Sequence, residues 1–106
     1  MGVLLDRHQG GIRLVTEFEV RRELDAIEAA DLHPRRKARR LLALARIARR
    51  EARKIAKGAA ILSLDCMDEQ ASRLRRVVAR METLGRDVRH RARRLLAGAS
   101  APRQET

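Results

Sequence analysis

Residues 34–62 read PRRKARRLLALARIARREARKIAKGAAIL, and apolar residues recur through this stretch at alternating steps of three and four. The positions are Ala38, Leu41, Ala45, Ala48, Ala52, Ile55, Ala59 and Leu62. This spacing is a heptad seam, which is typical of a helix that packs along a second helix. Pro34 suits the first turn of such a helix. We therefore expect a helix over about 34–62 that continues through Gly58, with an end at Lys57 as the alternative.

A second seam follows the sequence SLDCMD, which interrupts the pattern and in which Ser63 or Asp65 can cap a new helix. The seam positions are Met67, Ala71, Leu74, Val78, Met81, Gly85, Val88, Ala92 and Leu95. Their spacing again alternates between four and three residues, which predicts a helix over about 66–97.

Two seams of similar length joined by a short turn predict a long antiparallel helical hairpin that resembles a coiled coil. Folding the chain about residues 64 and 65 places Ala45 opposite Gly85, a pair small enough for the two backbones to approach closely. Leu44 and Leu84 precede seam positions and should be neighbours on one side of the hairpin. That apolar side needs a further partner.

A shorter helix over about 17–32 can supply this partner. Thr16 and Glu19 form the pattern of a capping box at its start, and Pro34 disfavours helical geometry at His33. Six acids against two arginines make this segment acidic. Its apolar residues are Phe18, Val20, Leu24 and Ile27. The expected fold is therefore all-α, either a three-helix bundle or a dimeric four-helix-type assembly that buries the same side.

The length of 106 residues fits a single domain. We expect a helical domain over 16–98, preceded by an N-terminal segment over 1–15 that is a small hairpin or disordered, and followed by a disordered tail over 99–106. No apolar run approaches the 18 residues of a membrane span, and the first residues do not have the pattern of a signal peptide. A cytoplasmic location is the expectation.

The formal net charge of +11 and the pI of about 11.6 favour an anionic partner. All but three of the 25 basic residues are arginine, which makes planar, multi-donor contacts with phosphate and carboxylate. A GC-rich genome that drifts towards arginine codons is the alternative explanation. Phe18 is the only aromatic residue, which disfavours base stacking and therefore single-strand binding.

Eleven bases stand against one acid, Glu51, over residues 34–57. The heptad places most of them opposite the seam, together with arginines of the following helix. The predicted binding residues are Arg36, Arg39, Arg40, Arg46, Arg50, Arg53, Lys54, Lys57, Arg73, Arg76 and Arg80. We expect them to form an arginine stripe that binds phosphates, although a solvated outer face or pairing with the acidic first helix would give the same pattern.

The turn of the hairpin carries the acidic sequence DCMDE, with Asp65, Asp68 and Glu69 as candidate functional residues. Acids also favour the first turn of a helix, where they meet its positive end. A basic antiparallel hairpin with an acidic tip resembles the coiled-coil arms of factors that enter the secondary channel of RNA polymerase. The zinc-binding cysteines of one such family and the second domain of the other are missing here.

The sequence contains no pattern for catalysis, a metal or a cofactor. The three histidines and Cys66 are scattered, and no serine has a placed histidine. We therefore expect a non-catalytic protein that binds the phosphate backbone of DNA or structured RNA. The alternative is a protein-interaction module, such as an adaptor, regulator or assembly subunit in transcription or secretion machinery. It would bind an acidic protein surface and use Leu44, Ile47 and Leu84 as an apolar strip.

Overall fold

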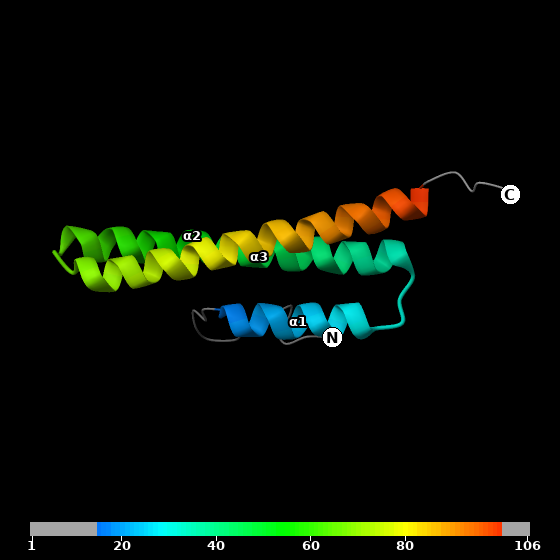
Figure 1. The fold of residues 1–106 in the computed structure, drawn as a ribbon, viewed down its shortest axis with the longest axis horizontal. Helices are drawn as coiled ribbons and strands as arrows, with labels where there is room; N and C mark the ends of the chain where they lie inside the picture. Colours follow the sequence, from blue (N-terminus) through cyan, green and yellow to red (C-terminus); the bar gives the residue numbers. More distant parts are fainter. Residues whose placement is uncertain (1–14, 101–106) are drawn as a thin grey trace, which may run out of the picture.

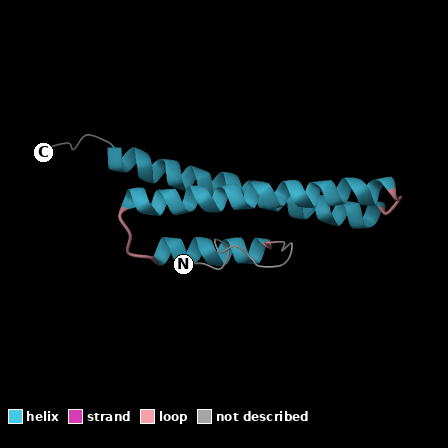
Figure 2. Ribbon diagram, turned by 180° about the vertical axis from the view of Figure 1, so that it is seen from behind, coloured by secondary structure: helices cyan, strands magenta, loops and turns pink. Residues whose placement is uncertain are grey.

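The computed structural model describes residues 15–100, which form three helices and no strand (Figures 1 and 2). Helices α2 (Pro34–Leu64) and α3 (Asp68–Ser100) form a long antiparallel hairpin, as expected. Helix α1 (Glu17–Ala29) lies beside the half of the hairpin that is remote from its turn (Figure 1). Within the described part of the chain, no helix is long and apolar enough to cross a membrane. Apart from Val15, the N-terminal segment predicted over 1–15 lies outside the described residues, as does 101–106.

Helix α1 begins with the predicted capping box. The backbone amide of Glu19 donates to Thr16 Oγ1 over 3.2 Å, and the amide of Thr16 donates to Glu19 Oε1 over 3.2 Å. The predicted end near residue 32 is wrong, because Ala30 adopts an extended conformation with φ −72° and ψ 139°. Residues 30–33 connect two antiparallel helices, and an extended segment is needed to span the distance between them.

Two local hydrogen-bonding groups that the sequence pattern did not indicate define the ends of α2. His33 is the N-cap, and its Nδ1 accepts from the amide of Arg35 over 3.2 Å. The helix continues through Gly58 to Leu64, two residues beyond the predicted end. At that end the amide of Cys66 donates to Ser63 O over 3.1 Å and that of Met67 to Leu62 O over 2.8 Å. These two bonds are those of a Schellman motif.

Cys66 occupies the position of the Schellman motif that glycine usually takes, with a φ of 61°. This left-handed conformation cannot belong to a right-handed helix, so α3 begins at Asp68 rather than at residue 66. The two predicted caps of α3 are wrong for the same reason: Asp65 is the C-cap of α2 and Ser63 lies within α2. At the other end α3 reaches Ser100, three residues further than predicted.

The core follows both seams where α1 covers the hairpin. The fully buried residues at seam positions there are Ala38, Leu41, Ala45, Ala48, Ala52, Met81, Val88 and Ala92. Gly85 lies among them, and a Cβ added to it would stand 3.4 Å from Ala48 Cβ and 3.6 Å from Ala45 O. The helices therefore touch here almost backbone to backbone, as the Ala45–Gly85 pairing predicts.

Helix α1 buries Val20, Leu24 and Ile27 against the side of the hairpin that holds Leu44 and Leu84. The three-helix arrangement thus covers the predicted apolar side within a single chain. The prediction that Phe18 joins this face is wrong, because Phe18 is 67% exposed. At the surface its ring makes a cation–π contact, with the guanidinium of Arg22 lying 5.7 Å from the ring centroid.

Truncating Leu41 tests the part of the core under α1. Leu41→Ala should cost about 2–5 kcal/mol of unfolding free energy, because the side chain is fully buried and leaves a cavity. Leu74→Ala is the matched control near the turn, where the side chain is only half-buried, and it should cost at most about 2 kcal/mol. Urea denaturation followed by circular dichroism measures both. Equal costs would contradict the uneven packing along the seam.

Candidate functional site

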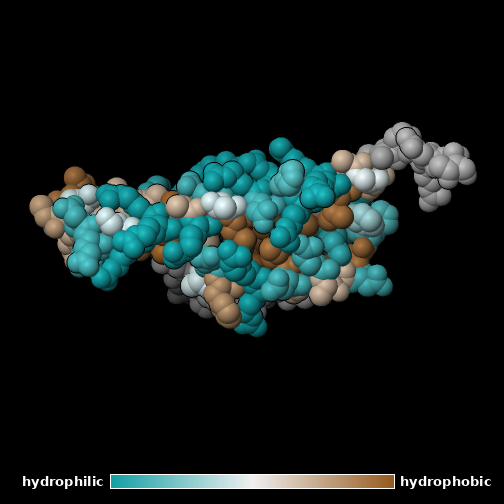
Figure 3. All heavy atoms as spheres, viewed as in Figure 1, coloured by the Kyte–Doolittle hydropathy of each residue, from teal (hydrophilic) through white to brown (hydrophobic). Residues whose placement is uncertain are grey.

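The two sides of the hairpin differ in what covers them. Each heptad contains two seam positions, and the second follows the first by three residues. In an antiparallel pair of such helices, the residues directly before the first seam positions share one side of the hairpin. The residues directly after the second seam positions share the other side. Helix α1 covers the first side, at Leu44 and Leu84. Hydrophilic residues gather along the edge of the hairpin away from α1 (Figure 3). The second side therefore faces solvent.

This second side is rich in arginine, and we call it the arginine face. Its members on α2 and α3 are Arg39, Arg46, Arg49, Arg53, Arg75, Arg86, Arg89 and Arg93. All are exposed except Arg89, which is half-buried. Among the described residues, none of the eight forms an ion pair. Their guanidinium groups are therefore not engaged by a carboxylate of the described chain.

The structure divides the predicted stripe among three surfaces. Arg39, Arg46 and Arg53 lie on the arginine face. Their heptad positions place Arg36, Arg50, Lys57 and Arg76 on the outer edges of the hairpin, where all four are exposed. The remaining four, Arg40, Lys54, Arg73 and Arg80, lie on the side that α1 covers in part. The residues that were predicted as one surface therefore do not form one.

Three cations of the last group have acidic partners. Lys54 Nζ lies 2.9 Å from Glu51 Oε2, Arg73 Nη2 lies 2.9 Å from Glu69 Oε1, and Arg80 Nε lies 3.0 Å from Glu17 Oε1. Pairing lowers the capacity of these three cations to bind another anion. We therefore expect Lys54, Arg73 and Arg80 to bind a phosphate less strongly than the unpaired arginines do.

Five members of the arginine face were not among the predicted binding residues: Arg49, Arg75, Arg86, Arg89 and Arg93. Three of them, Arg49, Arg75 and Arg89, each directly follow a seam residue. The prediction was based on positions opposite the seam, and these residues lie beside it. The signal was present, since the residue after the second seam position flanks the helix contact and reaches solvent on the uncovered side.

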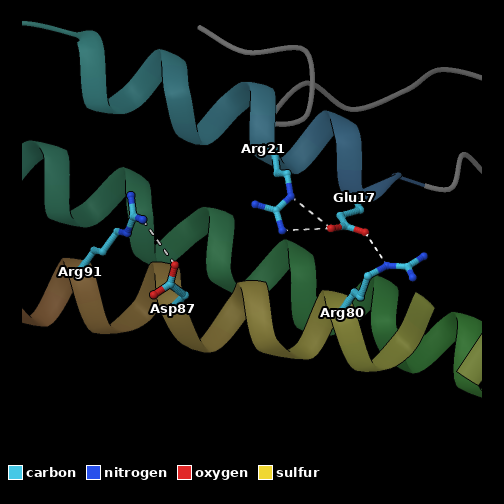
Figure 4. Close-up of polar contacts among 5 residues, drawn as sticks. All are labelled: Glu17, Arg21, Arg80, Asp87 and Arg91. Atoms are coloured by element: carbon cyan, nitrogen blue, oxygen red, sulfur yellow. Dashed lines mark hydrogen bonds and ion pairs between the residues drawn. The ribbon is translucent and has the colours of Figure 1, made fainter. Parts of the chain in front are cut away.

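Acids of α1 pair with arginines on the other side of the hairpin, and Figure 4 shows Glu17 of α1 between Arg21 and Arg80, with the Arg91–Asp87 pair of α3 beside it. Glu17 receives hydrogen bonds from Arg80 Nε of α3 over 3.0 Å and from Arg21 Nε over 3.1 Å. At the opposite end of α1, Arg91 of α3 pairs with Glu28, and its Nη2 lies 3.5 Å from Asp87 Oδ2. The expectation that the acidic helix meets basic flanks is thus met at both of its ends.

These contacts shift two pKa values. Partial desolvation raises the pKa of Glu17, but the hydrogen bonds from Arg80 and Arg21 outweigh it, so the pKa lies below its usual value. The pKa of Arg91 is raised, mainly by the hydrogen bond that its guanidinium donates to Glu28. Both shifts favour the charged forms and therefore the docked position of α1.

Glu51, the only acid in residues 34–57, is unavailable to the arginine face. Its side chain is 1% exposed and lies on the side that α1 covers. Oε1 accepts from the amide of Val15 over 2.9 Å, and Oε2 pairs with Lys54. This carboxylate therefore anchors the chain before α1 rather than neutralising the arginines.

The tip of the hairpin is apolar as well as acidic. The three acids predicted as candidate functional residues, Asp65, Asp68 and Glu69, are exposed to solvent. Beside them lie the largest exposed aliphatic side chains of the described residues, Leu64 at 83% and Ile61 at 59%. No group of three potential metal ligands occurs in residues 15–100. The tip therefore offers a mixed apolar and acidic surface.

The apolar strip of the alternative hypothesis is not a surface. Leu44 is completely buried, Leu84 is 3% exposed and Ile47 is 7% exposed, because α1 packs on this side. A protein partner could reach these residues only by displacing α1, so this part of the alternative hypothesis is wrong.

Comparison with known proteins assigns no relative: no family model matches the chain, and no curated protein or solved structure matches it significantly. The residues themselves are therefore the basis for a functional proposal.

Glu17 should make the stability of the bundle depend on pH. Because its folded pKa is lowered, its stabilising effect is present above the unfolded pKa of about 4.3 and is lost as the pH falls through the folded value. Glu17→Gln should therefore cost about 0.2–1 kcal/mol near neutral pH. The difference from the unsubstituted protein should shrink as the pH is lowered from neutral towards about 3, because protonation of Glu17 removes the charge that pairs with Arg80 and Arg21.

Urea denaturation at both pH values measures this effect. Glu69→Gln is the matched control, because Glu69 pairs with Arg73 of the same helix at the exposed tip and makes no ion pair between helices within the described chain. A cost for Glu17→Gln that persists unchanged at low pH would show that its charge does not hold α1.

Proposed function

We propose that the protein is a cytoplasmic, non-catalytic binder of nucleic acid that contacts the phosphate backbone of DNA or structured RNA through the arginine face. The observation that carries this proposal is a long surface of eight arginines, none of which forms an ion pair with an acid among residues 15–100. On the opposite side, the acids of α1 already pair with Arg80 and Arg91. An anion would therefore be bound on the arginine face.

The physical argument is electrostatic. Like charges held close together on a helix repel each other, which destabilises the fold unless a partner binds. Arginine binds phosphate with two parallel hydrogen bonds and is the preferred residue for this contact. Each neutralised phosphate also releases counterions, which adds affinity at low salt.

The geometry favours a duplex over a single strand. Arg39, Arg46 and Arg53 recur every seven residues, so they form a straight row with steps of about 10 Å on a rigid helix. The arginine face has no aromatic residue for base stacking, and Phe18 lies on α1. It also has no Asn or Gln for reading base edges. Binding by backbone charge and shape, without sequence specificity, follows.

The exposed tip favours a second candidate function. Leu64 and Ile61 beside Asp65 and Asp68 form a surface suited to a protein partner, since exposed aliphatic groups with a polar rim are typical of interfaces. A protein-interaction module in transcription or secretion machinery would use this tip. The arginine face would then meet an acidic protein surface.

A salt titration of binding to a duplex of roughly 30 base pairs tests the first proposal. We expect an affinity that falls steeply with salt, because the arginine face neutralises several phosphates. Arg46→Glu combined with Arg53→Glu should weaken binding at least about tenfold and make the log–log salt slope shallower by about 2.

The matched control is Arg22→Glu combined with Arg94→Glu, which changes the net charge equally outside the arginine face and should weaken binding only about twofold. Circular dichroism verifies that both variants keep their helicity. An equal loss in the two variants would mean that net charge, rather than this face, attracts the duplex. No binding at low salt would overturn the proposal and direct attention to the tip.

A further inference from the structure

A groove lies between α2 and α3 at the centre of the arginine face. Its volume is about 310 Å³, and its lining consists of Arg49, Arg53, Glu82, Arg86 and Arg89. Four arginines and one glutamate thus line the groove. Arginines from both helices therefore converge on this recess.

Helix geometry explains the convergence. Arg49 and Arg53 are four residues apart on α2, and Arg86 and Arg89 are three apart on α3, so each pair projects from one side of its helix. Gly85 brings the helices together beneath them, and a Cβ added at Gly85 would stand 3.6 Å from Arg49 Cγ. The stem of Arg49 therefore lies across the glycine, which positions its guanidinium over the groove.

The hydrogen-bond donors in the groove are largely unused. Among the described residues, none of the four arginines forms an ion pair, not even with Glu82 in the same groove. The hydrogen bond of Arg86 to Thr83 Oγ1 is long, at 3.4 Å. The groove therefore offers guanidinium donors to a ligand without first breaking a strong internal contact.

The charge of the groove indicates the class of ligand. Four positive charges against one negative charge leave three uncompensated. A single phosphodiester, with one negative charge, would leave most of this excess in place. Several linked phosphates would neutralise it and could accept bidentate hydrogen bonds from arginines of both helices.

We infer that this groove is a discrete binding site for linked phosphate groups. Free polyphosphate and consecutive phosphates of a nucleic-acid backbone share this chemistry. The site extends the proposed function, because a polyphosphate ligand needs neither sugar nor base. Glu82 is then an unfavourable neighbour that weakens binding and limits the site to highly charged ligands.

Isothermal titration of the full chain with tripolyphosphate, near physiological salt, tests the inference. We expect saturation at one equivalent. Arg49→Gln combined with Arg89→Gln should weaken binding at least about tenfold, since two guanidinium contacts are lost. Arg22→Gln combined with Arg94→Gln removes the same charge outside the groove and should change the affinity by less than about twofold. An equal loss in both variants, or no saturable binding, would overturn the site.

Glu82→Gln supplies a test with the opposite sign. Removing a like charge a few ångströms from the ligand should tighten tripolyphosphate binding by about fivefold, the effect of roughly 1 kcal/mol of repulsion in a water-like dielectric. A general loss of folding cannot produce tighter binding. Unchanged or weaker binding in this variant would place the ligand away from the groove.

Titrations with tripolyphosphate and with the 30-base-pair duplex, run in parallel, separate the two proposals. If tripolyphosphate binds and the duplex does not, the groove stands as a site for free polyphosphate and the proposed function fails. If the duplex binds and tripolyphosphate does not, the groove inference fails while the proposed function stands. If both bind, displacement of the duplex by tripolyphosphate identifies the groove as part of the backbone contact.

Discussion

The close contact of α2 with α3 at Gly85 decides the orientation of the rest of the molecule. With Ala45 and Ala48 opposite a residue that has no side chain, the two backbones meet in one register. That register directs Leu44 and Leu84 to one side of the hairpin and Arg49 and Arg89 to the other. Because the seam has a fixed heptad period, the same division continues along the helices, and each later feature of the fold depends on it.

Helix α1 gives the molecule its electrostatic asymmetry. Its apolar residues cover one side of the hairpin, and its acids at Glu17 and Glu28 pair with arginines of α3. Helix α1 therefore supplies both apolar core residues and acidic partners, and it does so only for the part of the hairpin that it covers. The eight arginines of the other side form no ion pair among residues 15–100, so the two sides of the hairpin differ in how far their cations are paired.

The sequence predicts the parts of this structure that depend on periodic or local patterns. The two seams, the continuation through Gly58 and the capping box at Thr16 belong to this class. The sequence does not indicate that Cys66 takes a left-handed conformation, nor that His33 caps α2, because these residues are uncommon in such roles. The place of Glu51 is not predictable from the sequence, because its buried carboxylate accepts a hydrogen bond from the amide of Val15, 36 residues away in the chain.

The hairpin extends well beyond α1, as Figure 1 shows, and this overhang makes its two halves unequal. Under α1 the large seam residues Leu41, Met81 and Val88 are fully buried. Towards the turn only the alanines of the seam, Ala59 and Ala71, are buried, and its large residues Ile55, Leu62, Leu74 and Val78 are half-buried. The distal turns therefore open locally at a lower free energy than the proximal ones. The amide protons of the turns near the hairpin tip should therefore exchange with solvent sooner than those under α1. The groove should lie near the boundary between these two parts of the hairpin.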